Sequence, residues 1–208
     1  MRAAGVRSTV AVVALLAAIC AGFWIALGDD FPDPSLRNVP PAGEDARKAS
    51  DQLAVVAFGD NRESYTTIRG FNQVVDLKFL SAEEIAAFRA GGAAAARVVV
   101  ASDLPEGKVV ALVVQMSDRG AAIGTAQRLT EIQLEAGFQE GPARTRLNWV
   151  RTVPDPEADP PAREVGRIFY VHADIVVRVE LAGNPGIDLD HALGALIDRQ
   201  LTVMPADG

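Results

Sequence analysis

The longest run of apolar positions lies at the amino terminus of the chain. No charged residue occurs between Arg7 and Asp29, and only Gly22 interrupts the apolar stretch 10–27. As a helix, the 21 residues 8–28 would span about 31 Å at ~1.5 Å per residue, close to the ~30 Å hydrocarbon core of a bilayer. The pattern therefore predicts a single transmembrane helix over residues 8–28.

The charges that flank this segment predict its orientation. Two arginines precede it and two aspartates follow it, so the positive-inside rule places the amino terminus in the cytoplasm and the rest of the chain outside the cell membrane. A cleaved signal peptide and lipid attachment at Cys20 are two alternatives that would also export the chain. However, the apolar run is longer than the ~7–15 residues of a signal peptide. The bulky Ile19 also precedes Cys20, where lipidation needs a small residue. We therefore favour an uncleaved signal anchor over residues 1–28.

A proline-rich acidic segment follows the predicted anchor. Residues 29–51 contain four prolines and few large apolar side chains, which predicts an extended tether. Residues 52–208 are predicted to form one extracytoplasmic domain, because these 157 residues bury enough surface to be stable without disulfides. Cys20 is the only cysteine, so a disulfide framework and a multi-cysteine zinc site are excluded.

Short apolar runs predict the strands of this domain. A run at 53–58 predicts a first strand. Two pairs of runs, each joined by a turn-rich linker, predict β-hairpins, over 98–101 with 108–116 and over 165–171 with 175–181. Positions 109–114 are apolar on both sides of their strand, which indicates a central strand that other elements cover.

Capping residues and the three-to-four spacing of apolar positions predict three helices, over 82–90, 117–136 and 189–204. Ser81 followed by Glu84 forms a capping box at the first of them. Ser117 is predicted to cap the second helix, which Gly137 closes. Asp188 is predicted to cap the last.

A hairpin followed by a helix thus occurs twice, over 97–137 and 165–204. Sequence identity between the two units is negligible, so the shared pattern does not establish an internal duplication. Two hairpins with helices on one side predict an α+β fold, a two-layer domain with a mostly antiparallel sheet and helices on one face.

Composition narrows the possible functions. The chain has 20 Lys and Arg against 27 Asp and Glu, a formal net charge of −7, which argues against a nucleic-acid binder. A hydrophobic fraction of 49% with 23% charged residues is too apolar for a disordered chain and too charged for a polytopic membrane protein. The predicted partners are the membrane, through residues 8–28, and an envelope protein or small ligand.

Only His172 and His191 supply imidazole groups for acid–base chemistry. His172 lies at the predicted turn of the second hairpin, and we interpret it as an exposed turn residue. His191 follows Asp188 and Asp190 at the start of the last helix, and these three groups could gather a metal ion. Asp188 is already explained as the N-cap and Asp190 by the helix dipole. Further ligands are missing, so no metal site is predicted.

Two other segments have the outline of ligand loops. Asp155, Glu157 and Asp159 alternate as in a calcium loop, but Pro160 stands where glycine is needed, and we interpret the segment as a spacer. Residues 120–124 are small and open a helix after a buried strand, yet they lack the dinucleotide and phosphate-loop fingerprints. We interpret them as residues that allow close packing of the helix on the sheet.

No motif of a serine, metal-dependent or cysteine hydrolase occurs in the sequence, and no catalytic, cofactor-binding or metal-binding residue is predicted. The sequence favours a non-enzymatic, membrane-anchored domain that binds a protein partner or a small ligand without a cofactor. One alternative is a hydrolase of envelope polymers in which Asp60 and Glu63 converge as a carboxylate pair. Another is a structural accessory subunit of a membrane complex.

Overall fold

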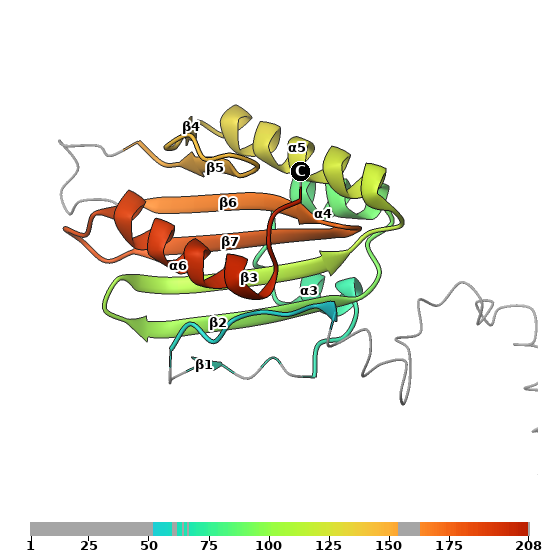
Figure 1. Cartoon of the computed structure of the whole chain (residues 1–208), viewed down its shortest axis with the longest axis horizontal. Coiled ribbons are helices and arrows are strands. Elements are labelled where there is room, and N and C mark those ends of the chain that lie inside the picture. The colour runs from blue at the N-terminus through green and yellow to red at the C-terminus, as the bar shows by residue number, and fades with distance from the viewer. Residues whose placement is uncertain (1–51, 60–61, 64, 66, 154–162, 208) are drawn as a thin grey trace, which may run out of the picture. The chain divides into compact units, whose positions relative to one another are not determined.

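The structure is a computed structural model that describes residues 52–59, 62–63, 65, 67–153 and 163–207. The predicted transmembrane helix 8–28 and tether 29–51 lie outside these ranges. No helix within the described ranges is long and apolar enough to cross a membrane. The described residues form an α+β fold on one antiparallel sheet, as predicted (Figure 1).

The sheet has seven strands in the order β1-β2-β3-β7-β6-β5-β4, and each neighbouring pair is antiparallel. The strands are β1 Arg62–Glu63, β2 Ala96–Leu104, β3 Gly107–Gln115, β4 Gln139–Glu140, β5 Asn148–Arg151, β6 Val165–His172 and β7 Ile175–Gly183. Both predicted hairpins are confirmed, as β2–β3 and β6–β7. They join at the centre of the sheet, where β3 pairs with β7 along its whole length.

The helices in the described part of the chain are α3 Phe71–Asp76, α4 Ala82–Ala90, α5 Arg119–Glu135 and α6 Leu189–Val203. The predicted bounds of α4 are confirmed. Its capping box is also formed, because the Ser81 hydroxyl accepts from the Glu84 N–H at 3.2 Å and the Glu84 carboxylate accepts from the Ser81 N–H at 2.9 Å. The predicted cap of α5 is wrong by one residue. Asp118 caps it, accepting from the Ala121 N–H at 2.8 Å, while the Ser117 hydroxyl donates to the Asp118 carboxylate.

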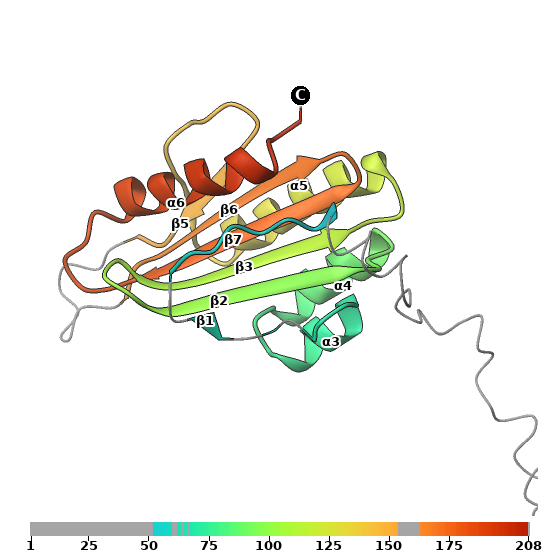
Figure 2. The same cartoon turned by 60° about the horizontal axis from the view of Figure 1, so that its bottom comes forward.

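Helices cover both faces of the sheet, so the predicted two-layer arrangement with helices on one face is wrong. Val109, Ala111 and Val113 of β3 belong to the buried cluster that contains α6. The alternate residues of β3 belong to a second cluster that contains residues of α3, α4 and α5. Figures 1 and 2 show α6 on one side of the sheet and the other helices on the opposite side. The physical reason is that the central strands are apolar on both faces, and each face needs a cover.

The two hairpin–helix units have opposite handedness. Strands β3 and β7 are antiparallel neighbours, so the rotation that exchanges the two hairpins has its axis perpendicular to the sheet. Such a rotation would leave both helices on the same face. Because α5 and α6 lie on opposite faces, no rotation superposes the two units, and the three-dimensional arrangement gives an internal duplication no support.

The segment 53–58 is not a strand, although its apolar pattern predicts one. Leu53 and Phe58 are buried in the cluster on the α6 face, but the segment pairs with a helix side chain instead of a strand. Gln200 of α6 accepts from the Val56 N–H and donates to the Ala54 carbonyl, both at 2.9 Å. The buried amide of Gln200 therefore replaces the hydrogen bonds that a neighbouring strand would supply.

Candidate functional site

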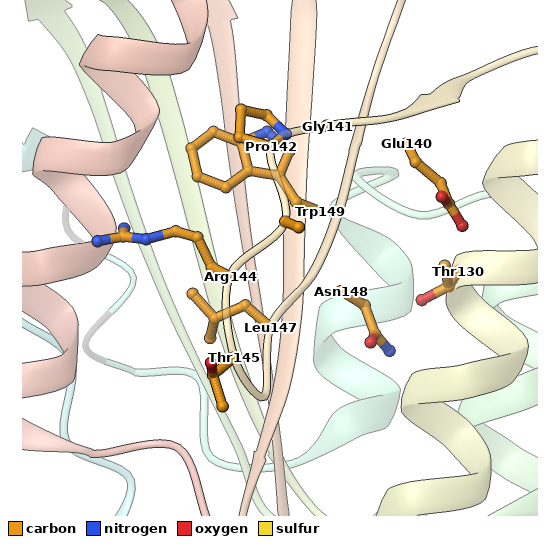
Figure 3. Close-up of a pocket in the computed structure, with 10 residues that line it drawn as sticks. Thr130, Glu140, Gly141, Pro142, Arg144, Thr145, Leu147, Asn148 and Trp149 are labelled. Atoms are coloured by element: carbon orange, nitrogen blue, oxygen red, sulfur yellow. The ribbon is translucent and has the colours of Figure 1, made fainter.

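A cavity of about 330 Å³ lies beside α6 and the loop that connects β4 to β5. Its lining comes from this loop, from β5 and from α6, namely Pro142, Arg144, Trp149, Asp190, His191, Gly194, Ala195 and Asp198. A second cavity, of about 460 Å³, shares Pro142, Arg144 and Trp149 with the first and extends to Thr130 of α5. Figure 3 shows Arg144 reaching towards α6, while Thr130 lies on the opposite side of the loop.

Strand alternation turns Trp149 towards the α6 face of the sheet. Trp149 pairs with Ile168 of β6 and is 6% exposed in the α6-side cluster, whereas the next residue, Val150, faces the other cluster. Gly141 of the loop donates its N–H to the Trp149 carbonyl at 2.8 Å. A Cβ on Gly141 would lie 2.1 Å from the indole Cδ1, so this close approach of loop and ring requires glycine. Pro142 of the same loop lines both cavities together with Trp149.

Three polar atoms from the lining of the 330 Å³ cavity are enclosed and have no hydrogen-bond partner among the described residues. They are Trp149 Nε1, Arg144 Nη1 and Asp190 Oδ1. A buried donor or acceptor without a partner costs about 1–3 kcal/mol, and more if it is charged. Each of the three atoms would therefore gain from a hydrogen-bond partner that the described residues do not supply.

In Arg144 and in Asp190, one terminal atom of the charged group has a partner and the other has none. Arg144 Nη2 donates to Asp198 Oδ1 at 2.7 Å, and both side chains of this pair are partly exposed, at 35% and 57%. Asp190 Oδ2 lies 3.7 Å from Arg151 Nη1. The second guanidinium nitrogen of Arg144 and the second carboxylate oxygen of Asp190 are the unpaired atoms. The residues that line the cavity thus hold three unpaired, enclosed atoms, two donors (an indole N–H and a guanidinium N–H) and one acceptor (a carboxylate oxygen).

Two residues of this cavity belong to the group that the sequence suggested, and then discounted, as metal ligands. Asp190 and His191 both line it, and Asp188 is the N-cap of α6 as predicted, accepting from the His191 N–H at 3.0 Å. Within the described ranges no group of three His, Cys, Asp or Glu side chains is placed to hold a metal ion. Trp149 and Arg144 were not predicted as site residues from the sequence. The one available signal was that Trp149 is the only tryptophan after the predicted anchor.

The other predicted positions lie elsewhere or outside the described residues. His172 is the last residue of β6 and not a turn residue, and its side chain is 34% exposed. Its Nδ1 lies 2.9 Å from the Pro205 carbonyl and 3.3 Å from Asp207 Oδ1 near the carboxyl terminus. Asp60 lies outside the described residues, and Glu63 is described only as a backbone position in β1. The acidic spacer containing residues 155–159 is outside them as well.

The small residues at the start of α5 do not all pack on the sheet. Ala122 is fully buried, as the close-packing interpretation requires. A Cβ on Gly124 would meet no atom within 4 Å, so the interpretation is wrong for this glycine.

A second polar cluster is buried between the sheet, α4 and α5. Arg178 of β7 is 1% exposed, and its Nε donates to Glu84 Oε1 at 3.0 Å and its Nη2 to Glu180 Oε2 at 2.9 Å. Arg167 of β6 donates to the same oxygen of Glu180 at 2.6 Å and also donates to the Gln133 side chain. The Gln133 amide donates to Glu84 at 3.2 Å and closes the ring of contacts.

The charges of this cluster cancel. Burial alone would raise the pKa of the Glu180 carboxyl, but Arg178 and Arg167 together lower it below its ordinary value. A cavity of about 600 Å³ adjoins the cluster and is lined in part by Glu84, Gln133 and Arg167. Apart from Arg178 Nη1, the charged groups of the cluster are paired with one another, so we interpret the cluster as structural.

No protein-family model matches the chain, and no curated protein matches it. Among solved structures, the extracellular domain of PknH from Mycobacterium tuberculosis is similar to it, with a TM-score of 0.39 and 14% sequence identity over 59% of this chain and 72% of that chain. A likeness at this level assigns no function to the present chain.

Proposed function

We propose that this chain is a membrane-anchored, extracytoplasmic binding domain that holds a small polar ligand in the 330 Å³ cavity and catalyses no reaction on it. The observation that carries the proposal is that three residues lining this cavity, Trp149, Arg144 and Asp190, each hold one enclosed polar atom without a partner in the described part of the chain. A few convergent polar groups in an otherwise apolar cavity are typical of small-molecule sites.

The volume of the cavity supports a small ligand over a protein partner. A cavity of about 330 Å³ lies at the lower end of the ~300–1000 Å³ range of small-molecule sites. The exposed large apolar residues of the described chain are Ile123, Leu134, Val153 and Val203. They lie in α5, in α6 and in the segment after β5, and none of them lines the cavity. The surface around the site thus has few of the apolar anchors that a protein interface needs.

The anchor and the orientation of the chain belong to the proposal and rest on the sequence. Residues 8–28 would hold the chain in the membrane with the amino terminus in the cytoplasm. Residues 29–51 would then hold the binding domain on the outer side as a tether.

A ligand screen on the full-length chain in mild detergent tests the proposal. A ligand that binds only the folded state at about 100 times its Kd adds about 2.7 kcal/mol of stability, which is readily measured as a shift in Tm. We expect at least one small polar compound to raise the Tm of the wild-type chain. The same compound should have a smaller effect on Trp149→Phe, which removes the indole N–H and keeps an aromatic ring.

Two results would contradict the proposed function. One is a set of ligand-induced Tm shifts that are equal in the wild type and in Trp149→Phe, because the ligand would then bind elsewhere. The other is turnover of a bound compound by the purified chain, which would make the protein an enzyme.

A further inference from the structure

Each aspartate of the cavity lining has an arginine as its counterion, Arg144 within the lining for Asp198 and Arg151 outside the lining for Asp190. Arg144 lies 2.7 Å from Asp198, and Arg151 lies 3.7 Å from Asp190. The charges within each of these ion pairs cancel. A ligand with a net charge would leave one charge of this set without compensation in a partly enclosed site, which is costly. The balance therefore favours a ligand with no net charge.

The unpaired atoms specify how charge is distributed within that ligand. Arg144 Nη1 and Trp149 Nε1 are both donors and call for an acceptor, and the charge of Arg144 favours an anionic one. Asp190 Oδ1 is an anionic acceptor and calls for a donor, preferably a cationic one. A net-neutral ligand with a carboxylate at one end and an ammonium group at the other satisfies all three atoms.

We propose that the ligand is a free α-amino acid, an inference that rests on the proposed function of the same cavity. Its carboxylate accepts hydrogen bonds from Arg144 Nη1 and Trp149 Nε1, and its ammonium group donates to Asp190 Oδ1. A neutral sugar also offers donors and acceptors, but sugars usually stack on an open aromatic face. At 6% exposure, Trp149 presents little of its face for stacking, and the unpaired group of the ring is its N–H.

Arg144 is the residue that has to move when the ligand enters. The three unpaired atoms are enclosed by protein, whereas the Arg144 and Asp198 side chains are partly exposed. An exposed ion pair contributes little to stability and exchanges readily with water. Arg144 can therefore leave Asp198, open the cavity and close again with its Nη1 on the ligand carboxylate.

The fluorescence of Trp149 provides the assay. The chain has two tryptophans, Trp24 and Trp149, so the full-length Trp24→Phe variant in mild detergent carries a single reporter within the site. This variant is titrated separately with each common amino acid, with the N-acetyl and amide derivatives of any that bind, and with neutral sugars. We expect saturable binding of one or a few amino acids, and at least a tenfold weaker Kd for both derivatives.

Two aspartate variants in the same background test the assigned contacts. Asp190→Asn removes the charge that faces the ammonium group and should weaken binding at least tenfold. Asp174→Asn, at the β6–β7 turn and outside the lining of the cavity, is the matched control and should bind as tightly as the parent. Equal affinities of the two variants would overturn the amino-acid assignment.

The remaining outcomes separate the two proposals. If a neutral sugar binds, and Asp190→Asn weakens that binding while no amino acid binds, the amino-acid inference is wrong and the proposed binding function stands. If N-acetyl or amide derivatives bind as tightly as the parent amino acid, the ligand is a peptide-like segment and the inference is also wrong. If no compound of any class binds, both the inference and the proposed function fall.

Discussion

Replacing Arg178 with methionine should destabilise the fold far more than the same replacement at an exposed arginine. Arg178 is 1% exposed between two carboxylates, those of Glu84 and Glu180, at 3.0 Å and 2.9 Å. Methionine fills much of the same space with an unbranched apolar chain. The substitution therefore removes one charge and its hydrogen bonds while the cavity that it leaves is small.

The magnitude follows from what remains around the vacated position. Glu180 keeps Arg167 as a counterion at 2.6 Å. Glu84 is 2% exposed and keeps hydrogen bonds from the Ser81 N–H and the Gln133 amide, but it loses the cation that balances its charge. Removal of one partner from a buried ion pair costs about 3–5 kcal/mol. We expect a loss of this size in the free energy of unfolding, measured by urea titration of the full-length chain.

Arg128→Met is the matched control. Arg128 on α5 also binds two carboxylates, Glu131 and Glu135, at 3.0 Å each, but its side chain is 45% exposed. The two substitutions are chemically the same and differ in burial. Because solvent screens exposed ion pairs, the control should lose only a small fraction of the stability that Arg178→Met loses. Equal losses in the two variants would refute the reasoning.

A second variant separates the charge effect from a packing effect. In Arg178→Met with Glu84→Gln, the uncompensated charge is gone while the shape and the capping hydrogen bond at Ser81 are kept. This double variant should recover part of the stability lost by the single one, because a neutral buried amide costs less than a lone carboxylate. A double variant less stable than Arg178→Met would show that the loss comes from packing.

The pH dependence of stability provides an independent check on the same cluster. In the wild type, Arg178 and Arg167 hold the pKa of Glu180 below its ordinary value of 4.5 against the opposing effect of burial. A lowered folded-state pKa contributes stability that is complete above about pH 4.5 and is lost as the pH falls through the folded-state pKa. Arg178→Met removes one of the two cations, so the difference in unfolding free energy between the wild type and the variant should narrow at acidic pH. A difference that is constant between about pH 3 and pH 6 would contradict this.

Three further predictions concern the site and the elements that support it. Gly194→Ala should raise stability by about 1 kcal/mol through helix propensity and also weaken ligand binding. Gly124→Ala is the control, because its Cβ meets no atom within 4 Å, and it should raise stability by a similar amount without an effect on ligand binding. If both alanine variants bound the ligand more weakly, the assignment of the cavity would be contradicted. Gln200→Leu leaves two backbone groups of the segment 53–58 unpaired and should cost about 2–4 kcal/mol, with faster amide exchange in that segment. Unchanged exchange would show that the segment has other anchors. Asp188→Ala removes the N-cap of α6 and should cost about 1 kcal/mol, and Asp188→Ser should restore most of it in urea titrations.

The hydrophobic pattern predicts most of the elements but not the side of the sheet on which each helix lies. Apolar runs and turn signals were sufficient to predict both hairpins, and the capping box predicted the start of α4 correctly. The positions 109–114, apolar on both faces, already indicated that both sides of the sheet are covered. The face to which a helix returns depends on the path of its connection and on the packing of distant segments. For that reason, the local pattern of the second hairpin–helix unit did not show that α6 covers the opposite face.

The segment 53–58 failed as a strand prediction for a different reason. Its apolar run correctly indicates a segment that packs on the core, where Leu53 and Phe58 are buried. Whether such a chain becomes a strand depends on which groups complete its backbone hydrogen bonds. Here Gln200, 144 residues away from Val56, provides them, and a polar residue on the inner face of α6 was the only sign of it in the sequence.

The two polar clusters show why the candidate site could not be predicted from spacing. Arg178 contacts Glu84 across 94 residues, and Trp149 and Asp190 meet at the cavity from separate elements, so neither cluster leaves a local motif. A charged residue among buried neighbours predicts only that some partner exists. The fold then decides between two outcomes: the cluster around Arg178 finds most of its partners within the chain and stabilises it, whereas the cavity beside Trp149 retains two donors and one acceptor unpaired in the described structure. That difference, visible only in three dimensions, is what makes the second cluster a binding site in our proposal and the first a structural element.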